Sequence, residues 1–333
     1  MEAIDLQKHF FQEIKSRLPS HISFVDDIAD LLNISNDSAY RRIRGEKAIS
    51  FDELQKISKY YQISLDSLMG VNSSSTLFQG HWIDASNFHF EQYLEDMLLQ
   101  ATTIRNATKR KMIYYEAKDF PPFHYFQFTE LASFKFFFWM RTILSYAEYN
   151  KLCFEDIDLK SSLLKISTNI IRTYNEIPCV EIWSLETINS TLRQIEYYME
   201  NNVFRTRERI VLVINELLQM LEHVKEEAEH GEKLIRGQKP LGNKNFQLFF
   251  NEVYLGHNTI MTECDEKDTI FINHGVLNYM MTRDKGFCAH TKKYFENTMK
   301  KSSLISSVNE KERNRFFNIL ITKTNKLLDK ALH

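Results

Sequence analysis

The sequence is poor in the residues that interrupt helices. Its 333 residues include only 9 glycines and 5 prolines. Because both residue types break helices and mark tight turns, their scarcity argues against a turn-rich all-β fold. Apolar material is ample at 43% of the chain, and domains usually run to about 100–200 residues. We therefore expect a mainly α protein with two domains, or three.

Cysteine is also scarce, and long apolar runs are missing. The four cysteines lie far apart and form no C-x-x-C pair: Cys153, Cys179, Cys264 and Cys288. This spacing predicts free thiols in a reducing compartment. The start "MEAIDLQKHF" has acids where a signal peptide needs a basic region. The densest apolar stretch, Phe134–Met140, is far shorter than the ~18–20 residues of a membrane span, so we expect a cytoplasmic protein with no membrane partner.

Motifs of enzymes and cofactor sites are missing as well. The sequence has no P-loop, no G-x-G-x-x-G, no H-E-x-x-H and no G-x-S-x-G. The "CAH" at Cys288–His290 lacks a second ligand pair, which favours an ordinary thiol and a surface histidine over half a metal site. Asp119 is either a solvated loop acid or part of a pocket wall. We expect no enzyme, no cofactor and no metal.

Charge of one sign is not in excess either, except in one short segment. The chain carries 42 basic and 44 acidic residues, for a net charge of -2. Yet "LLNISNDSAYRRIRGEK" places three arginines within four positions, at Arg41, Arg42 and Arg44. Gly45 follows, and glycine is favoured just past a helix end. The segment predicts a helix over 36–44 with an arginine-rich side.

Four more short helices are predicted around it within the first seventy residues. The first shows apolar residues four apart, on one stripe. The second has Ser23 as its N-cap and ends at Asn33, a residue type that tolerates the left-handed conformation. A capping box of Ser50 and Glu53 begins the fourth helix, and a fifth begins at Ser64. Together they predict a five-helix bundle.

The segment from about residue 20 to 70, "DIADLLNISNDSAYRRIRGEKAISFDELQKISKYYQISLDSLMG", resembles the phage-repressor-like (XRE, Cro-type) helix-turn-helix domains. Small Ala29 stands where two helices cross closely, and Asn33 where the family often has glycine. Ser35 matches the cap of the recognition helix, and the G-x-K of Gly45–Lys47 follows near its end. The resemblance implies a bacterial DNA-binding transcription regulator with the helix 36–44 in the major groove.

Helix geometry separates an inner from an outer side of this predicted helix. Ala39 and Ile43, four apart, face the bundle because a helix turns 100° per residue. The predicted DNA-binding residues are Ser35, Asn36, Asp37, Tyr40, Arg41, Arg42, Arg44 and Lys47. We expect the early ones to read base edges and the late ones to contact phosphate, although Tyr40 and Arg41 could exchange roles. The alternative is a solvated charged face, since residues 1–70 hold eleven acids against nine basic residues.

The rest of the chain predicts a linker and a larger α+β domain. The helix-turn-helix domain, 1–70, is followed by a serine-rich linker, 71–85, and by a domain over 86–333. Helical patterns in that domain occur near 87–108, 121–144, 155–176, 184–202, 206–235, 287–300 and 309–332. A strand is expected over 111–117, and three or four short β-rich runs after residue 244 predict a small antiparallel sheet. The expected architecture is a helical layer with this sheet.

Features of the larger domain leave alternatives open. Ile214, Leu217, Leu221, Val224 and Ala228 form a short heptad seam that either joins two subunits or packs internally. The aromatic run Phe123–Trp139 either fills the core, which is favoured, or walls an apolar pocket. "SSLISSVNEKERNRFFNIL" and "FPPFHYFQFTELASFKFFFW" are similar to uncharacterised Bacteroidetes-type regulators, which implies no particular ligand.

These observations predict double-stranded DNA as the main partner. Two half-sites about one helical turn apart, ~34–36 Å, require two recognition helices and therefore a homodimer. The larger domain would dimerise the protein and respond to a possible small-molecule effector. One alternative makes that domain an enzyme or signal binder whose DNA-binding domain is autoregulatory. Another makes the helix-turn-helix domain a protein-binding module.

Overall fold

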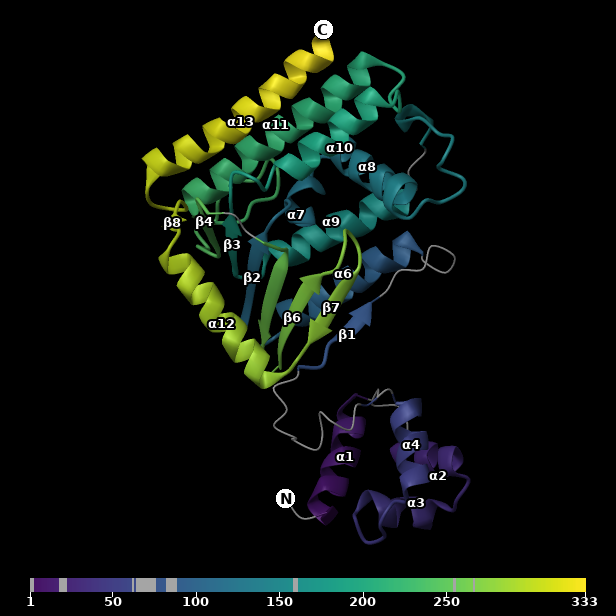
Figure 1. Cartoon of the computed structure of the whole chain (residues 1–333). Helices are drawn as coiled ribbons and strands as arrows, with labels where there is room; N and C mark the ends of the chain where they lie inside the picture. Colours follow the sequence, from purple (N-terminus) through teal and green to yellow (C-terminus); the bar gives the residue numbers. More distant parts are fainter. Residues whose placement is uncertain are drawn as a thin grey trace. The chain divides into compact units, whose positions relative to one another are not determined.

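Two separate units, Met1–Leu77 and Phe78–His333, divide the chain. Both appear in Figure 1, and each is described by itself. The boundary falls within the predicted linker, 71–85. The computed structural model describes residues 3–17, 23–61, 63, 76–81, 89–157, 161–253, 256–265 and 267–333. The fifth helix predicted for the first unit, from Ser64, lies outside the described residues.

The smaller unit is a helical bundle around an apolar core. Its described helices are α1 (Ala3–Arg17), α2 (Phe24–Leu32), α3 (Asn36–Ile43) and α4 (Phe51–Tyr60). The predicted capping box at the start of α4 is confirmed, since Ser50 and Glu53 make both reciprocal bonds. Ser23 occupies the predicted N-cap of α2, but its side chain makes no capping bond. Local sequence signals therefore place these helices well.

The larger unit contains an eight-stranded sheet in the order β1-β7-β6-β5-β2-β3-β4-β8. The strands are β1 (Gln79–His81), β2 (Lys111–Ala117), β3 (Cys179–Trp183), β4 (Phe246–Phe250), β5 (Thr259–Cys264), β6 (Lys267–Asn273), β7 (Tyr279–Thr282) and β8 (Ser303–Leu304). Strands β2, β3 and β4 are parallel, and the other pairs are antiparallel. The expected class, mainly α with a sheet-containing domain, is confirmed; the sheet is larger than three or four strands and is mixed.

Helices cover both faces of this sheet unequally (Figure 1). The large core on one face is built from α6 (Phe90–Arg105), α7 (Pro122–Tyr125), α8 (Thr129–Phe138), α9 (Ser161–Asn175), α10 (Asn189–Glu200), α11 (Arg207–His230) and α13 (Glu310–Leu332), with short π-helical and 3-10 turns at Trp139–Ile143 and Phe154–Asp156. A smaller cluster on the other face packs against α12 (Lys285–Lys300). Because helices lie on both faces, the central strands are buried on both sides.

The structure answers the two questions left open for the larger domain: what the heptad seam packs against and what the aromatic run does. The heptad seam packs internally, since all five of its residues on α11 are fully buried within the unit's own core. In the aromatic run, Phe134, Phe136 and Phe137 are core residues, whereas Phe123 and Trp139 also line a cavity. Among the helices that the structure describes, none is long and apolar enough to cross a membrane.

Candidate functional sites

The turn between α2 and α3 presents α3 at the surface of the smaller unit. Asn33 adopts the left-handed conformation predicted for it, with φ 56°. The Ile34 N–H then donates to the Ala29 carbonyl at 3.0 Å, and Ser35 accepts from the Ser38 N–H as the N-cap of α3. Ala29 and Ala39 are both buried, with 3% and 0% exposure. Because both side chains are small, α2 and α3 can cross closely.

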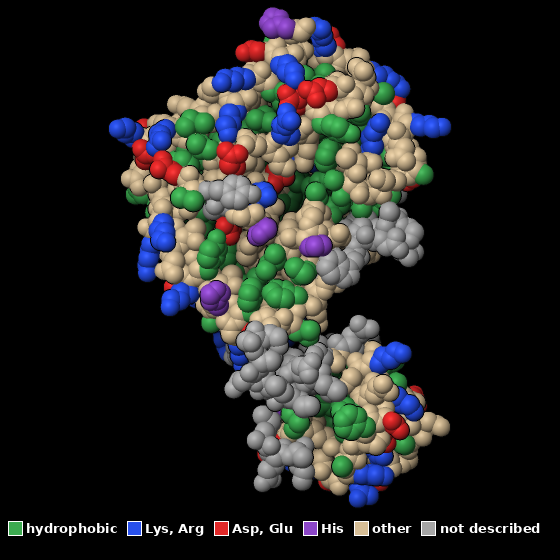
Figure 2. Space-filling view, in the orientation of Figure 1, with side chains coloured by type: hydrophobic (Ala, Val, Ile, Leu, Met, Phe, Trp, Pro, Cys, Tyr) green, Lys and Arg blue, Asp and Glu red, His purple; other side chains and the backbone are tan. Residues whose placement is uncertain are grey.

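The outer side of α3 is open to solvent. Seven of the eight predicted DNA-binding residues are exposed: Ser35, Asn36, Asp37, Tyr40, Arg41, Arg44 and Lys47. Figure 2 shows a group of Lys and Arg side chains over this part of the small unit. The Asn36 amide donates to Asp26 Oδ1 at 2.8 Å, and the Arg44 guanidinium lies 5.4 Å from the Tyr40 ring centroid. The residues predicted to read bases thus lie on one exposed face.

Arg42 was predicted to contact phosphate, but its side chain lies inside the bundle. It is only 6% exposed, and its Nε and Nη2 donate to the two Glu53 oxygens at 3.1 and 2.7 Å. Its Nη1 donates to the Ser38 carbonyl at 3.2 Å. The hydrogen bond from Arg42 lowers the pKa of Glu53. Arg42 therefore ties α3 to α4 inside the bundle, and the guanidinium is not free for DNA.

Replacing Arg42 with methionine is expected to destabilise the smaller unit by about 1–3 kcal/mol, because Glu53 loses its charged partner while only 19% exposed. Hydrogen exchange of α2–α4 amides in the full chain measures this loss. Arg44→Met is the matched control, since the Arg44 side chain is 59% exposed; its effect should stay within about 0.5 kcal/mol. Equal protection in both variants would contradict the assigned role of Arg42.

Gln7 on α1 holds the loop that follows α3. Its Nε2 donates to the carbonyls of Arg42 and Lys47, at 2.7 and 2.8 Å. The Ile49 N–H donates back to Gln7 Oε1 at 3.1 Å. One side chain thus fixes the loop that carries two predicted phosphate contacts, Arg44 and Lys47. Sequence reasoning missed Gln7, because a lone polar residue on a helix gives no signal of a partner 35–42 positions away.

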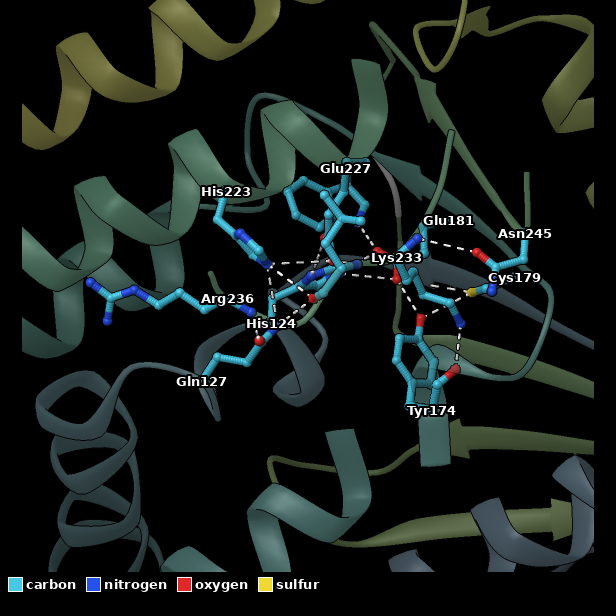
Figure 3. Close-up of polar contacts among 12 residues, drawn as sticks. His124, Gln127, Tyr174, Cys179, Glu181, His223, Glu227, Lys233, Arg236 and Asn245 are labelled. Carbon is cyan, nitrogen blue, oxygen red and sulfur yellow. Dashed lines mark hydrogen bonds and ion pairs between the residues drawn. The ribbon is translucent and has the colours of Figure 1, made fainter. Parts of the chain in front are cut away.

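A second polar cluster lies in the core of the larger unit (Figure 3). His124 on α7 donates through Nε2 to the Glu181 carboxylate of β3, 2.9 Å from Oε2. Its Nδ1 lies 3.5 Å from Glu227 Oε2 on α11. Glu181 also accepts from the Tyr174 hydroxyl at 2.5 Å and from the Trp183 indole N–H at 2.7 Å. These contacts join α7, α9, α11 and the central strand β3.

The charges of this cluster stabilise one another. Burial alone would lower the pKa of His124, but the charge of Glu181, the hydrogen bond to Glu181 and the neighbouring Glu227 carboxylate raise it to about 10. Burial opposes ionisation of Glu181, but His124 and the surrounding donors lower its pKa. Lys233 donates to the carbonyls of Tyr174, at 2.6 Å, and Ile177. His124 is therefore an imidazolium held between two carboxylates.

The cluster is closed to solvent. His124, Glu181 and Glu227 are 3%, 0% and 1% exposed, so their polar atoms depend on one another and on the surrounding core for partners. Within the described ranges, no group of three or more acidic, histidine or cysteine side chains could hold a metal ion. Cys288 of the "CAH" motif is buried on α12, with a pKa that burial raises to about 11.

The larger unit also contains a cavity of about 1120 Å³ on the side of the sheet that α6 covers. Its lining includes side chains from α6, β2, β5, β6, β7 and α10 and from the loop after β2. Asp119 is among the lining residues, so it belongs to a pocket wall. Tyr174 is shared, since its ring lines the cavity while its hydroxyl donates to Glu181. The cavity and the buried cluster are therefore neighbours.

Comparison with known proteins gives one match. A family model described as the BetR domain matches residues 21–108, roughly a quarter of the chain. The matched segment includes α2, α3 and α4 of the smaller unit and α6 of the larger one. No curated protein matches the chain, and no solved structure does.

Proposed function

We propose that the protein is a sequence-specific DNA-binding transcription regulator. The observation that supports this most is the open face of α3, where Asn36, Asp37, Tyr40 and Arg41 are all exposed at one side of a helix that follows a tight turn. In helix-turn-helix proteins the start of the second helix meets base edges in the major groove. Such a protein would act in the cytoplasm, without catalysis.

Each exposed side chain suits one kind of DNA contact. Arg41 can fork onto the O6 and N7 of guanine, Asn36 can pair with adenine, and Asp37 can accept from the amine of cytosine. Arg44 and Lys47 suit phosphate, which sets register and salt dependence rather than sequence choice. Arg42 is not among the proposed DNA contacts, because Glu53 binds its guanidinium.

A dimer follows from this mode of binding. One recognition helix supplies too few contacts for a strong specific complex, whereas two helices ~34–36 Å apart read a two-fold operator. We therefore propose that two copies bind together, so that a signal acting on the larger unit would change the spacing of the two recognition helices.

Selection of bound duplexes from a random pool by the purified full chain tests the proposal. We expect a two-fold motif, and we expect Arg41→Ala to weaken binding to it by about 1–3 kcal/mol per site and to relax one base position. Lys56→Ala is the matched control, because it removes an exposed charge from α4 and should leave the motif intact.

Three outcomes would count against this function. The first is no enrichment at low salt. The second is a motif that Arg41→Ala leaves unchanged at every position. The third is association that does not weaken with added salt, since contacts to phosphate release counterions; that result would favour a protein partner for α3.

A further inference from the structure

The cavity of the larger unit is apolar and aromatic where its wall is buried. The buried lining residues include Ala101, Ile104, Ile113, Tyr115, Tyr125 and Trp139. Phe123 and Tyr174 add a pair of stacked rings with centroids 4.0 Å apart. Pockets for small molecules are usually lined in this way, and flat rings pack well against other rings. The buried wall therefore suits a ligand with an aromatic body.

The charges closest to this buried wall neutralise each other. Asp119 is a half-buried lining residue, and its Oδ2 lies 3.8 Å from the ammonium of Lys135. Lys135 is 1% exposed, and its Nζ donates to Thr191 Oγ1 at 2.7 Å and to Gln194 Oε1 at 2.8 Å. The same ammonium lies 5.4 Å from the centroid of the Tyr125 ring. Neither member of this ion pair is therefore left as a counter-ion for a ligand.

The other charged or ionisable side chains of the lining, apart from the tyrosines, occupy exposed positions. They are His89, Asp96, Lys118, Glu186, Arg193 and His257. Acidic and basic residues both occur among them, so the exposed part of the lining favours neither sign. A charged group that entered the buried part would lose its hydration without gaining a counter-ion there, which is unfavourable. The buried part therefore favours a ligand without charge.

Two tyrosine hydroxyls supply neutral polar contacts inside the cavity. Tyr115 on β2 and Tyr125 on α7 both line it, and they are 4% and 2% exposed. Neither hydroxyl makes a hydrogen bond to a described residue, and neither is sealed off by protein atoms, so both open into the cavity. A tyrosine hydroxyl can donate and accept. These two groups therefore suit a ligand that carries a hydroxyl, carbonyl or amide group.

We propose that this cavity binds an uncharged aromatic compound with at least one hydroxyl, carbonyl or amide group. The rings of the compound pack against the aromatic side chains of the wall, and its polar group forms hydrogen bonds with the hydroxyls of Tyr115 and Tyr125. The volume, about 1120 Å³, accommodates a ligand of drug size. This inference goes beyond DNA binding and does not depend on it, because every residue involved lies in the larger unit.

Calorimetry on the full chain with three matched probes tests the proposal. The probes share a naphthalene body and differ in the head group: 2-(1-naphthyl)ethanol is neutral, 2-(1-naphthyl)ethylamine is a cation, and 1-naphthylacetate is an anion. We expect the alcohol to bind about tenfold more tightly than either charged probe, because neither charge finds a counter-ion in the buried wall. A charged probe that binds as tightly as the alcohol, or no binding by the alcohol, would overturn the proposal.

Isosteric variants locate the polar contacts. Tyr115→Phe and Tyr125→Phe should each weaken binding of the alcohol about three- to tenfold, because each removes one neutral hydrogen bond. Binding of 1-ethylnaphthalene, which has no polar group, should change less than about twofold in both variants. Tyr197→Phe is the matched control, since Tyr197 is 50% exposed and is not a lining residue. Alcohol binding equal to wild type in both variants, or equal weakening of the two probes, would contradict the assigned contacts.

Discussion

Replacing Glu181 with glutamine is expected to lower the free energy of unfolding of the larger unit by about 3–5 kcal/mol. Glu181 is 0% exposed and accepts from His124, Tyr174 and Trp183. The variant keeps the size of the side chain but removes the charge that holds the buried imidazolium. It also puts an NH₂ group where one of the donors had an acceptor. A buried charge that loses its partner is among the costliest single changes in a protein.

Urea unfolding followed by tryptophan fluorescence measures this effect, since Trp183 contacts Glu181 directly and reports on the same unit. Glu252→Gln is the control, because the Glu252 side chain is 63% exposed; its effect should be below about 0.5 kcal/mol. A loss of less than about 1 kcal/mol in the Glu181 variant would show that the cluster does not contribute as described.

The larger unit is also expected to lose stability as the pH rises from about 6.5 to about 10. The pKa of His124 is raised from 6.5 to about 10 in the folded protein, so across this range the folded state keeps a proton that the unfolded state releases. The stabilisation from His124 is therefore complete below pH 6.5 and is lost through pH 10. The slope is at most about 1.4 kcal/mol per pH unit for one group.

Other groups of the cluster also affect how the stability of the larger unit depends on pH. Glu181 has a lowered pKa, so its contribution is present above about pH 4.5 and is lost as the pH falls further. Lys233 has a pKa that burial lowers, so its titration favours the folded state as the pH rises and opposes the effect of His124. The combined stabilisation from His124 and Glu181 should be largest between about pH 4.5 and 6.5.

A comparison of wild type with a His124 variant isolates the contribution of His124 to the pH dependence of stability. Free energies of unfolding measured from pH 5 to 10 for wild type and for His124→Gln should converge as the pH rises, because the variant cannot lose this proton. His290→Gln, at an exposed position on α12, should instead run parallel to wild type. Parallel profiles for wild type and His124→Gln would mean that His124 binds its proton equally in the folded and unfolded states, so that the pKa is not raised by folding.

The parts of this structure that could be predicted from sequence are those fixed by local signals. Ser35, Asn33 and the Ser50–Glu53 pair act within three or four positions of themselves, so the boundaries of α2, α3 and α4 follow from the sequence. The apolar spacing of α11 likewise predicted a long helix. Strand β2, an alternating segment rich in isoleucine and tyrosine, was expected over the range it occupies, 111–117.

The parts that were missed depend on contacts between distant segments. Strand β3 was not expected, because all five of its residues are buried and such a strand shows no alternation. Because strand β3 was not predicted, Glu181 was not expected to lie in the core. The sequence signal that could have indicated it is the single glutamate within the apolar run "CVEIW". Arg42 was expected at DNA because its position on the helix does not reveal that Glu53 faces it.

The short helix α7 connects two regions of the larger unit through consecutive residues. Phe123 stacks on Tyr174 with ring centroids 4.0 Å apart and lines the cavity, while His124 lies between Glu181 and Glu227. A rotation of α7 that reshaped the cavity would have to draw a charged ring away from both counter-ions. That wall of the cavity is therefore preorganised, because it has its shape before any ligand binds. Preorganisation reduces the entropy lost on binding and favours ligands whose shape already fits the cavity.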